Sequence, residues 1–136
     1  MKNGLVIDEE GNKCWYKDDI LHREGDLPAI EWTDGSKYWY KNGKLHREGD
    51  LPAIECITRD KYWYKEGKLY REDDKPAIEY GYGTKYWYKD DLIHREGGKP
   101  AIEFFNGGKL WYYEGKKLEV NSNEEALRLI KMKVFW

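Results

Sequence analysis

The chain has 136 residues and a formal net charge of −2, with 24 Lys and Arg against 26 Asp and Glu. This length suits one domain that buries its own core without disulfides or metals. The near balance of charge provides no overall field for nucleic acid or anionic lipid, so binding driven by bulk charge is excluded. Seven tryptophans and twelve tyrosines in a chain with 37% charged residues are typical of strands with solvated, aromatic faces.

The start of the chain carries no targeting signal. Met1 to Gly4 lack a basic segment followed by an apolar run, and no stretch reaches the roughly 18 apolar residues of a membrane span. Cys14 and Cys56 lie neither in a CxxC pair nor at metal-ligand spacing from a histidine. We therefore expect free thiols, no membrane partner and a cytoplasmic location, in the host cell if the source is viral.

A 24-residue unit recurs along the chain. Each copy has a Trp-Tyr pair, and the copies align without gaps on Trp15, Trp39, Trp63, Trp87 and Trp111. A Pro-Ala-Ile-Glu segment recurs at the same step, starting at Pro28, Pro52, Pro76 and Pro100. The repetition predicts an array over residues 1–120, with four full units and two partial ends.

Short aromatic and β-branched runs, separated by Asp-Gly, Asn-Gly and Glu-Gly pairs, predict strands joined by tight hairpins and exclude helix in the array. A two-residue turn at Asp34-Gly35 would place Ile30 opposite Trp39 and Ala29 opposite Tyr40. In that register Ile and Trp share one face of the sheet, while Ala, Tyr and Leu share the other.

A second two-residue turn is expected at Asn42-Gly43. It would place Leu45 opposite Tyr40 and His46 opposite Trp39, which gives each unit a third short strand. Corners of different shape are expected where other pairs replace these turns: Asp18-Asp19, Thr58-Arg59 and Asp90-Asp91.

After Val120 the repeat stops and a helix is predicted. Ser122 is the expected N-cap and Glu125 completes a capping box, ahead of an apolar stripe that runs to Met132. Residues 121–136 belong to the same domain as the array. The helix, with Val134, Phe135 and Trp136, either covers the exposed end of the array or binds a partner or a second copy.

The predicted fold class is all-β: a repeated β-hairpin meander or solenoid-like elongated sheet, open or rolled, with a short C-terminal capping α-helix.

The full motif is Trp-Tyr-x-x-Gly-x-Leu-His-Arg-Glu-Gly-x-x-Pro-Ala-Ile-Glu, followed by Asp-Gly-x-Lys-x-Trp. It resembles the MORN-repeat variant of many phage and giant-virus proteins and of proteins described as antitoxins of toxin–antitoxin pairs. The resemblance covers roughly Gly4 to Leu118, and it implies a β-meander scaffold without a cofactor, of phage or mobile-element origin. Tyr70, in place of the usual His, and residues 57–60, in place of the usual turn, depart from it.

The histidines and the His-Arg-Glu string do not predict a metal or catalytic site. His22, His46 and His94 occupy one repeat position, so successive copies lie at least two strands, about 10 Å, apart. A string that recurs with the repeat indicates architecture, whereas an active site gathers different groups at one place. We expect no enzyme activity, no cofactor and no metal.

Lysines flank the aromatic triplets, as Lys37 and Lys41 do, and could form a groove for single-stranded nucleic acid. However, the glutamates of the Pro-Ala-Ile-Glu segments should lie on the neighbouring strand and offset that charge: Glu31, Glu55, Glu79 and Glu103. Direct nucleic-acid binding and self-assembly through a sheet edge or the helix remain alternatives.

A rigid surface of Tyr, Trp and alternating charge is the chemistry of protein interfaces. The sequence therefore favours a module that binds and blocks a host or bacterial protein. With the resemblance, this indicates an inhibitor of a defence system, such as an anti-CRISPR protein acting on a nucleoprotein effector, or an antitoxin. Candidate partner contacts are residues of the middle repeats: Arg59, Tyr62, Tyr70, Asp73, Asp74 and Tyr82.

Overall fold

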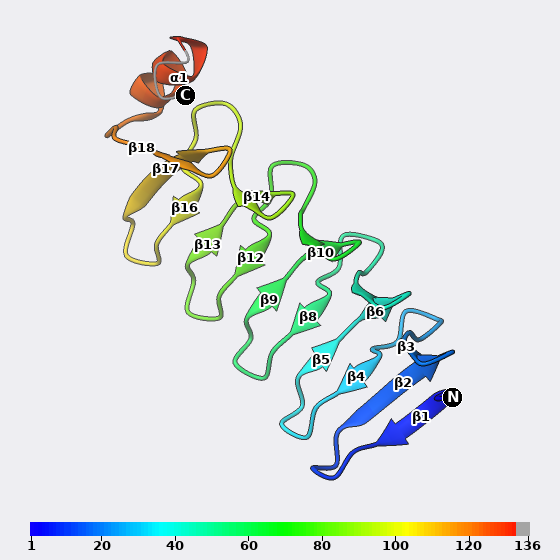
Figure 1. Ribbon diagram of the computed structural model, residues 1–136. Coiled ribbons are helices and arrows are strands. Elements are labelled where there is room, and N and C mark those ends of the chain that lie inside the picture. The colour runs from blue at the N-terminus through cyan, green and yellow to red at the C-terminus, as the bar shows by residue number, and fades with distance from the viewer. Residues whose placement is uncertain (133–136) are drawn as a thin grey trace. The chain divides into compact units, whose positions relative to one another are not determined.

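The computed structural model describes residues 1–132 and confirms the predicted fold class. Antiparallel hairpins repeat along the chain, and one short helix follows them (Figure 1). The chain divides into two compact units, Met1–Lys68 and a second unit that begins at Leu69.

The first unit is built from β1 to β10. Their bounds are β1 (Gly4–Ile7), β2 (Lys13–Lys17), β3 (Ile20–Leu21), β4 (Ile30–Glu31), β5 (Lys37–Tyr38), β6 (Tyr40–Lys41), β7 (Lys44–Leu45), β8 (Ile54–Glu55), β9 (Lys61–Tyr62) and β10 (Tyr64–Lys65). Strands β1, β2, β4, β5, β8 and β9 pair in that order. β3 pairs with β2, and β6 pairs with β7.

The second unit repeats the pattern and ends in the helix. In sequence, β11 (Lys68–Leu69) joins the two units. The remaining elements are β12 (Ile78–Glu79), β13 (Lys85–Tyr86), β14 (Tyr88–Lys89), β15 (Leu92–Ile93), β16 (Ile102–Glu103), β17 (Lys109–Tyr113), β18 (Lys116–Leu118) and α1 (Asn123–Met132). Strands β12, β13, β16, β17 and β18 pair in that order, and β14 pairs with β15.

The predicted register of the hairpin that β4 and β5 form around Asp34-Gly35 is wrong by one residue. Ile30 lies opposite Tyr38, and Glu31 lies opposite Lys37. The hairpin closes on a Trp32–Ser36 pair, where the amide of Trp32 donates to the carbonyl of Ser36 at 2.9 Å. Three residues therefore form the loop, rather than the two that were predicted.

Backbone conformation explains the shift. A two-residue type I′ turn needs positive φ at both loop residues, but of the pair Asp34-Gly35 only Gly35 has it, at 97°. A type I turn followed by one left-handed residue needs three loop residues and forms a bulge. The one-residue shift moves Ile30 to the face of Tyr38, so the predicted sharing of faces between Ile and Trp is also wrong.

The predicted difference in corner shape is wrong as well. Arg59 adopts φ 72° and takes the place of Gly35, with the same hydrogen bond from its amide to the carbonyl of the residue before the loop, here Cys56 at 2.8 Å. Asp18 and Asp19, at φ 50° and 66°, form the same left-handed pair as Asn42-Gly43. Different residues thus adopt the same turn shape at equivalent positions of the repeats.

The second turn is as predicted. Tyr40 lies opposite Leu45, and the amide of His46 donates to the carbonyl of Trp39 at 3.1 Å. A third short strand, such as β7, follows from this turn in the repeats.

Each repeat buries one alanine, one isoleucine and one tryptophan. Ala53 is fully buried, and Ile54 and Trp63 are 7% and 6% exposed. The tryptophan lies between two short strands and remains hydrogen-bonded to the next repeat, since the amide of Trp39 donates to the carbonyl of Ala53 at 2.7 Å. Alanine at that point lets the two backbones approach.

Helix α1 covers the last repeat, as predicted (Figure 1). Ser122 caps it, because its Oγ accepts the amide of Glu125 at 3.2 Å. Ala126 is fully buried in a cluster with Trp111 and Leu118. Of the predicted cover, Val134, Phe135 and Trp136 lie outside the described residues.

Gly98 makes room for this helix. It stands where earlier repeats carry aspartate, at 26, 50 and 74. A Cβ atom at Gly98 would lie 2.8 Å from the carbonyl oxygen of Asn123 and 2.9 Å from the Cβ of Leu127. The missing side chain therefore lets α1 pack against the backbone of the repeat.

We expect Gly98→Ala to destabilise the fold more than Gly49→Ala. Both glycines have left-handed φ, 70° and 75°, so both variants incur backbone strain of about 1 kcal/mol. Only Gly98→Ala also overpacks the helix contact, which adds about 2 kcal/mol, since a Cβ at Gly49 meets nothing within 4 Å. Denaturant unfolding of both variants measures the difference, and equal losses would show that α1 does not depend on this contact.

Candidate functional site

An arginine lies over the tryptophan ring in the repeats of Trp15, Trp39 and Trp87. The guanidinium of Arg47 lies over the ring of Trp39, with Cζ 3.7 Å from the ring centroid. Its Nη1 donates to the carbonyl of Pro52 and to Oε2 of Glu55, each at 3.1 Å, and its Nε donates to Oδ1 of Asp26 at 2.9 Å. The side chain of Arg47 is only 12% exposed, whereas those of Asp26 and Glu55 are 53% and 39% exposed. The guanidinium is therefore buried, while its carboxylate partners remain in contact with solvent.

The aspartate of the preceding repeat binds both partners of this stack. Its carboxylate accepts from Arg47, and its backbone carbonyl accepts from Nε1 of Trp39 at 3.1 Å. In the second unit Asp74 does the same for Arg95 and Trp87, at 2.9 and 3.0 Å. The His-Arg-Glu string is therefore engaged in contacts that join one repeat to the next.

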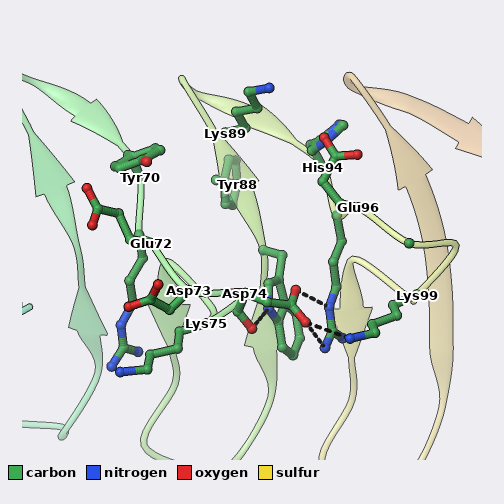
Figure 2. Close-up of a pocket in the computed structure, with 14 residues that line it drawn as sticks. Tyr70, Glu72, Asp73, Asp74, Lys75, Tyr88, Lys89, His94, Glu96 and Lys99 are labelled. Atoms are coloured by element: carbon green, nitrogen blue, oxygen red, sulfur yellow. Dashed lines mark hydrogen bonds and ion pairs between the residues drawn. The ribbon is translucent and has the colours of Figure 1, made fainter.

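A hollow of about 410 Å³ opens beside this network in the second unit (Figure 2). Tyr70 and Asp73 lie along one wall, Lys99 lies on the other, and Asp74 lies between them. The carboxylate of Asp74 accepts two hydrogen bonds in this hollow, from Nε of Arg95 and from Nζ of Lys99, each at 2.9 Å.

The first unit has an equivalent hollow with different lining. His22, Gly25 and Leu51 stand where the second unit has Tyr70, Asp73 and Lys99. A hollow thus forms at equivalent repeat positions in both units, and the side chains that line it differ between them.

Hydrogen bonds set the ionisation of the carboxylates here. Donation from Arg95, with a smaller contribution from Lys99, holds the pKa of Asp74 below its ordinary value, although partial burial opposes this. In the first unit the hydrogen bond from His46 lowers the pKa of Glu48. Burial is the main cause that raises the pKa of the thiol of Cys56, so the thiolate is disfavoured.

A second feature is an aromatic cluster on the hairpin loops of the second unit. Tyr82 stacks on Tyr80, with ring centroids 5.4 Å apart, and meets Phe105 edge-on at 5.9 Å. Tyr80 also meets Tyr86 edge-on at 5.6 Å, which ties the cluster to strand β13. Tyr82 and Phe105 are 63% and 69% exposed. We call Tyr80, Tyr82 and Phe105 the aromatic cluster.

The loops that carry the cluster are ordered by a buried contact. Thr84 is 2% exposed, and its Oγ1 accepts the amide of Phe105 at 3.1 Å. Residues 80–84 and 104–108 contain no charged side chain, whereas the first loop of the chain carries Asp8, Glu9 and Glu10. The cluster therefore lies on two loops that carry no charged side chain.

The predicted contact residues fall into three places. Tyr70, Asp73 and Asp74 line the hollow of the second unit, and Tyr82 belongs to the aromatic cluster. Both Arg59 and Tyr62 lie in the first unit, where Arg59 forms a loop and half-buried Tyr62 pairs with Ile54 in the sheet.

Sequence reasoning missed Tyr80, Phe105 and Lys99. An aromatic residue at an uncharged loop position would have indicated the first two. Lys99 could have been found as a charged residue at a repeat position that holds Leu27 and Leu51 in the first unit.

The predicted charge ladder is confirmed. Lys37 lies between Glu31 and Glu55 in the sheet register, and Lys85 is likewise paired with Glu103.

Within residues 1–132, no group of three His, Cys, Asp or Glu side chains is arranged to hold a metal ion. In the same residues, every fully buried polar side-chain atom has a hydrogen-bond partner.

Comparison of the chain with protein-family models, with curated proteins and with solved structures gave no match. In the part of the chain that the structure describes, no helix has the length and apolar character needed to cross a membrane.

We expect Arg47→Lys to destabilise the protein by about 2 kcal/mol. Lysine retains the charge but cannot stack flat on Trp39 while donating in several fixed directions. Denaturant unfolding measures the loss, and Arg128→Lys, at an exposed position of α1, is the control that should change little. A neutral Arg47→Lys variant would contradict the role of the guanidinium.

We expect Asp74→Asn to lower stability at pH 7 and to make it less sensitive to acid. Because the pKa of Asp74 is depressed in the fold, its carboxylate stabilises the native state above the unfolded pKa. That contribution is lost as the pH falls through the folded pKa, so the difference from wild type should shrink below about pH 4. Unfolding curves at pH 7 and pH 2.5 test this.

The neighbouring exposed carboxylate provides the control. Asp73→Asn removes a charge from the same hollow without touching Arg95, and it should change stability little at either pH. A constant difference between wild type and Asp74→Asn at both pH values would refute the assignment.

Proposed function

We propose that this chain is a non-enzymatic module that binds a protein partner through the aromatic cluster of its second unit. The observation that carries the proposal is the exposure of Tyr82 and Phe105, at 63% and 69%, on loops that hold no charge. Aromatic enrichment with depletion of charge distinguishes the centre of a protein interface from ordinary surface.

The geometry of the cluster favours tight binding. Stacking on Tyr80 and the contact between Tyr82 and Phe105 restrict the rings before any partner arrives. The buried Thr84 fixes the backbone of the second loop. Since little freedom remains to be lost, more of the contact energy contributes to affinity.

The chemistry of the surrounding sheet favours a protein over single-stranded nucleic acid. Lysines that could neutralise phosphates alternate in register with glutamates, as Lys85 does with Glu79 and Glu103. A nucleic-acid groove needs a continuous positive path beside its stacking rings.

The kind of partner follows from the resemblance of the repeat to the MORN variant of phage and antitoxin-type proteins. On that basis, the partner is a host or bacterial protein whose working surface the module covers. A defence nucleoprotein, as for an anti-CRISPR protein, and the toxin of a toxin–antitoxin pair are the two forms of this proposal.

The test compares capture from bacterial lysate by tagged wild type and by the double variant Tyr82→Ser/Phe105→Ser. We expect a stoichiometric protein that wild type retains and the double variant loses. With the purified partner, loss of about 2 kcal/mol per hot-spot ring corresponds to roughly 30-fold weaker Kd for each. Nuclease treatment of the lysate should leave capture by wild type intact.

Ile57→Ser is the matched control, because Ile57 is 63% exposed in a hairpin loop of the first unit. It should retain the partner, and circular dichroism should show that all variants fold. Equal capture by wild type and the double variant would rule out the aromatic cluster as the binding surface.

A further inference from the structure

Three buried histidines each connect their own repeat to the next one. His22, His46 and His94 are 8%, 8% and 4% exposed. Nδ1 of each ring accepts the backbone amide of a residue 20 positions later, at 3.0, 3.0 and 2.8 Å, from Asn42, Glu66 and Glu114 respectively.

These contacts fix the protonation of the rings. A backbone amide can only donate, so Nδ1 must be the unprotonated nitrogen and Nε2 must carry the hydrogen. Nε2 in turn donates to the glutamate two residues later, as His46 does to Glu48 at 2.6 Å. The fold therefore uses one neutral tautomer of each histidine.

The residues whose backbone amides donate to the histidines each begin a left-handed turn. Glu66 and Glu114 have φ 50° and 49°, a left-handed conformation that is strained for a non-glycine residue. A second bond helps to hold the turn, since the amide of Gly67 donates to the carbonyl of Leu45 at 2.8 Å. The histidine is thus one of two contacts that hold a strained turn on the neighbouring repeat.

Protonation would remove the contact at Nδ1. An imidazolium carries hydrogens on both nitrogens, so it cannot accept, and its new N–H would face the N–H of the turn. The amide would lose its partner while the bond from Nε2 to glutamate would gain charge and strengthen. The glutamate carboxylate thus stabilises the imidazolium, whereas the backbone amide of the turn loses its hydrogen bond.

The charges around each ring are mixed. Around His22 they are Glu24, which bonds Nε2, with Lys17 and Lys41 beside that carboxylate. Around His46 they are Glu48, with Lys41 and Lys65 beside it, and Glu66 of the turn. Around His94 they are Glu96, Lys89, Asp90 and Glu114, and the ring of Tyr113 lies 4.5 Å away. None of these groups replaces the acceptor that Nδ1 provides.

Two other turns are held without histidine and give an internal comparison. The backbone amide of Asp18 donates to Oδ1 of Asn3 at 2.8 Å. The side-chain amide of Asn3, which does not titrate, thus provides the acceptor that a histidine ring provides at the other turns. At the position of Tyr70, the turn is held by its own aspartate, because Oδ1 of Asp91 accepts the amide of Leu69 at 2.7 Å.

We propose that His22, His46 and His94 are proton-operated latches, and that protonation of these rings on acidification releases the turns 42–43, 66–67 and 114–115. The turns at 18–19 and 90–91, which no histidine holds, stay in place. This device is independent of the aromatic cluster, which lies on the hairpin loops.

The test is site-resolved amide hydrogen exchange by NMR on the wild-type protein at pH 7.5 and 5.5, corrected for the intrinsic pH dependence of exchange. We expect protection of the amides of Asn42, Glu66 and Glu114 to fall at least about tenfold on acidification, while that of Asp18 stays constant. Unchanged protection at the three sites, or an equal loss at Asp18, overturns the proposal.

Two variants separate the latch from a general effect of acid. His46→Asn keeps an acceptor bonded to Cγ, as Asn3 provides, so Glu66 should stay protected at both pH values while Asn42 and Glu114 respond as in wild type. His46→Ala removes the acceptor, so Glu66 should be unprotected at both. If the amide of Glu66 in His46→Asn still loses protection on acidification, the ring of His46 is not the latch. If either variant fails to fold, the comparison of turns within wild type decides.

Discussion

A guanidinium lying over an indole ring is the contact around which the repeats of Trp15, Trp39 and Trp87 are arranged. Arg47 lies over Trp39 and donates to the carboxylate of Asp26 in the preceding repeat. It also donates to the carbonyl of Pro52 and to the carboxylate of Glu55. Arginine can do this because its fork donates in several fixed directions while its face stacks. The stack links three segments that are separated in sequence, and the repeat also buries an alanine and an isoleucine, such as Ala53 and Ile54.

Because this network stabilises the repeat, the hairpin loops are left free to differ. The closing residue is buried in some of these loops, where Ser36 and Thr84 each accept an amide of the following loop. The other loop positions range from Asp8, Glu9 and Glu10 at the start of the chain to Tyr82 and Phe105 in the second unit. A scaffold of this kind separates stability from recognition, which is the basis of the proposed protein-binding role.

The histidines illustrate how one repeated position can have both a structural and a responsive role. As neutral rings they join adjacent repeats through both nitrogens, and the chain uses Asn3 and Asp91 where it joins repeats without them. The proposed response to acid therefore depends on which residue stands at the position, while the architecture around it stays the same.

The sequence alone determined the 24-residue period, the short strands, the second turn, the helix with its cap at Ser122 and the pairing of lysines with glutamates. These follow from local rules and from a spacing that repeats without gaps. It also singled out Tyr70 and Asp73, which depart from the repeat and line one hollow together with Asp74.

Only the tertiary structure decided the register of the first hairpin, the shape of its corners and the aromatic cluster. An Asp-Gly pair fits both a two-residue and a three-residue loop, and the φ of the aspartate chooses between them. Arg59 adopts the left-handed φ of the equivalent Gly35, which its own local preference does not predict. Tyr82 and Phe105 meet because stacked hairpins bring together loops 24 residues apart, and Gly98 matters because α1 packs on it. Such contacts depend on distances between repeats, which local sequence preferences do not specify.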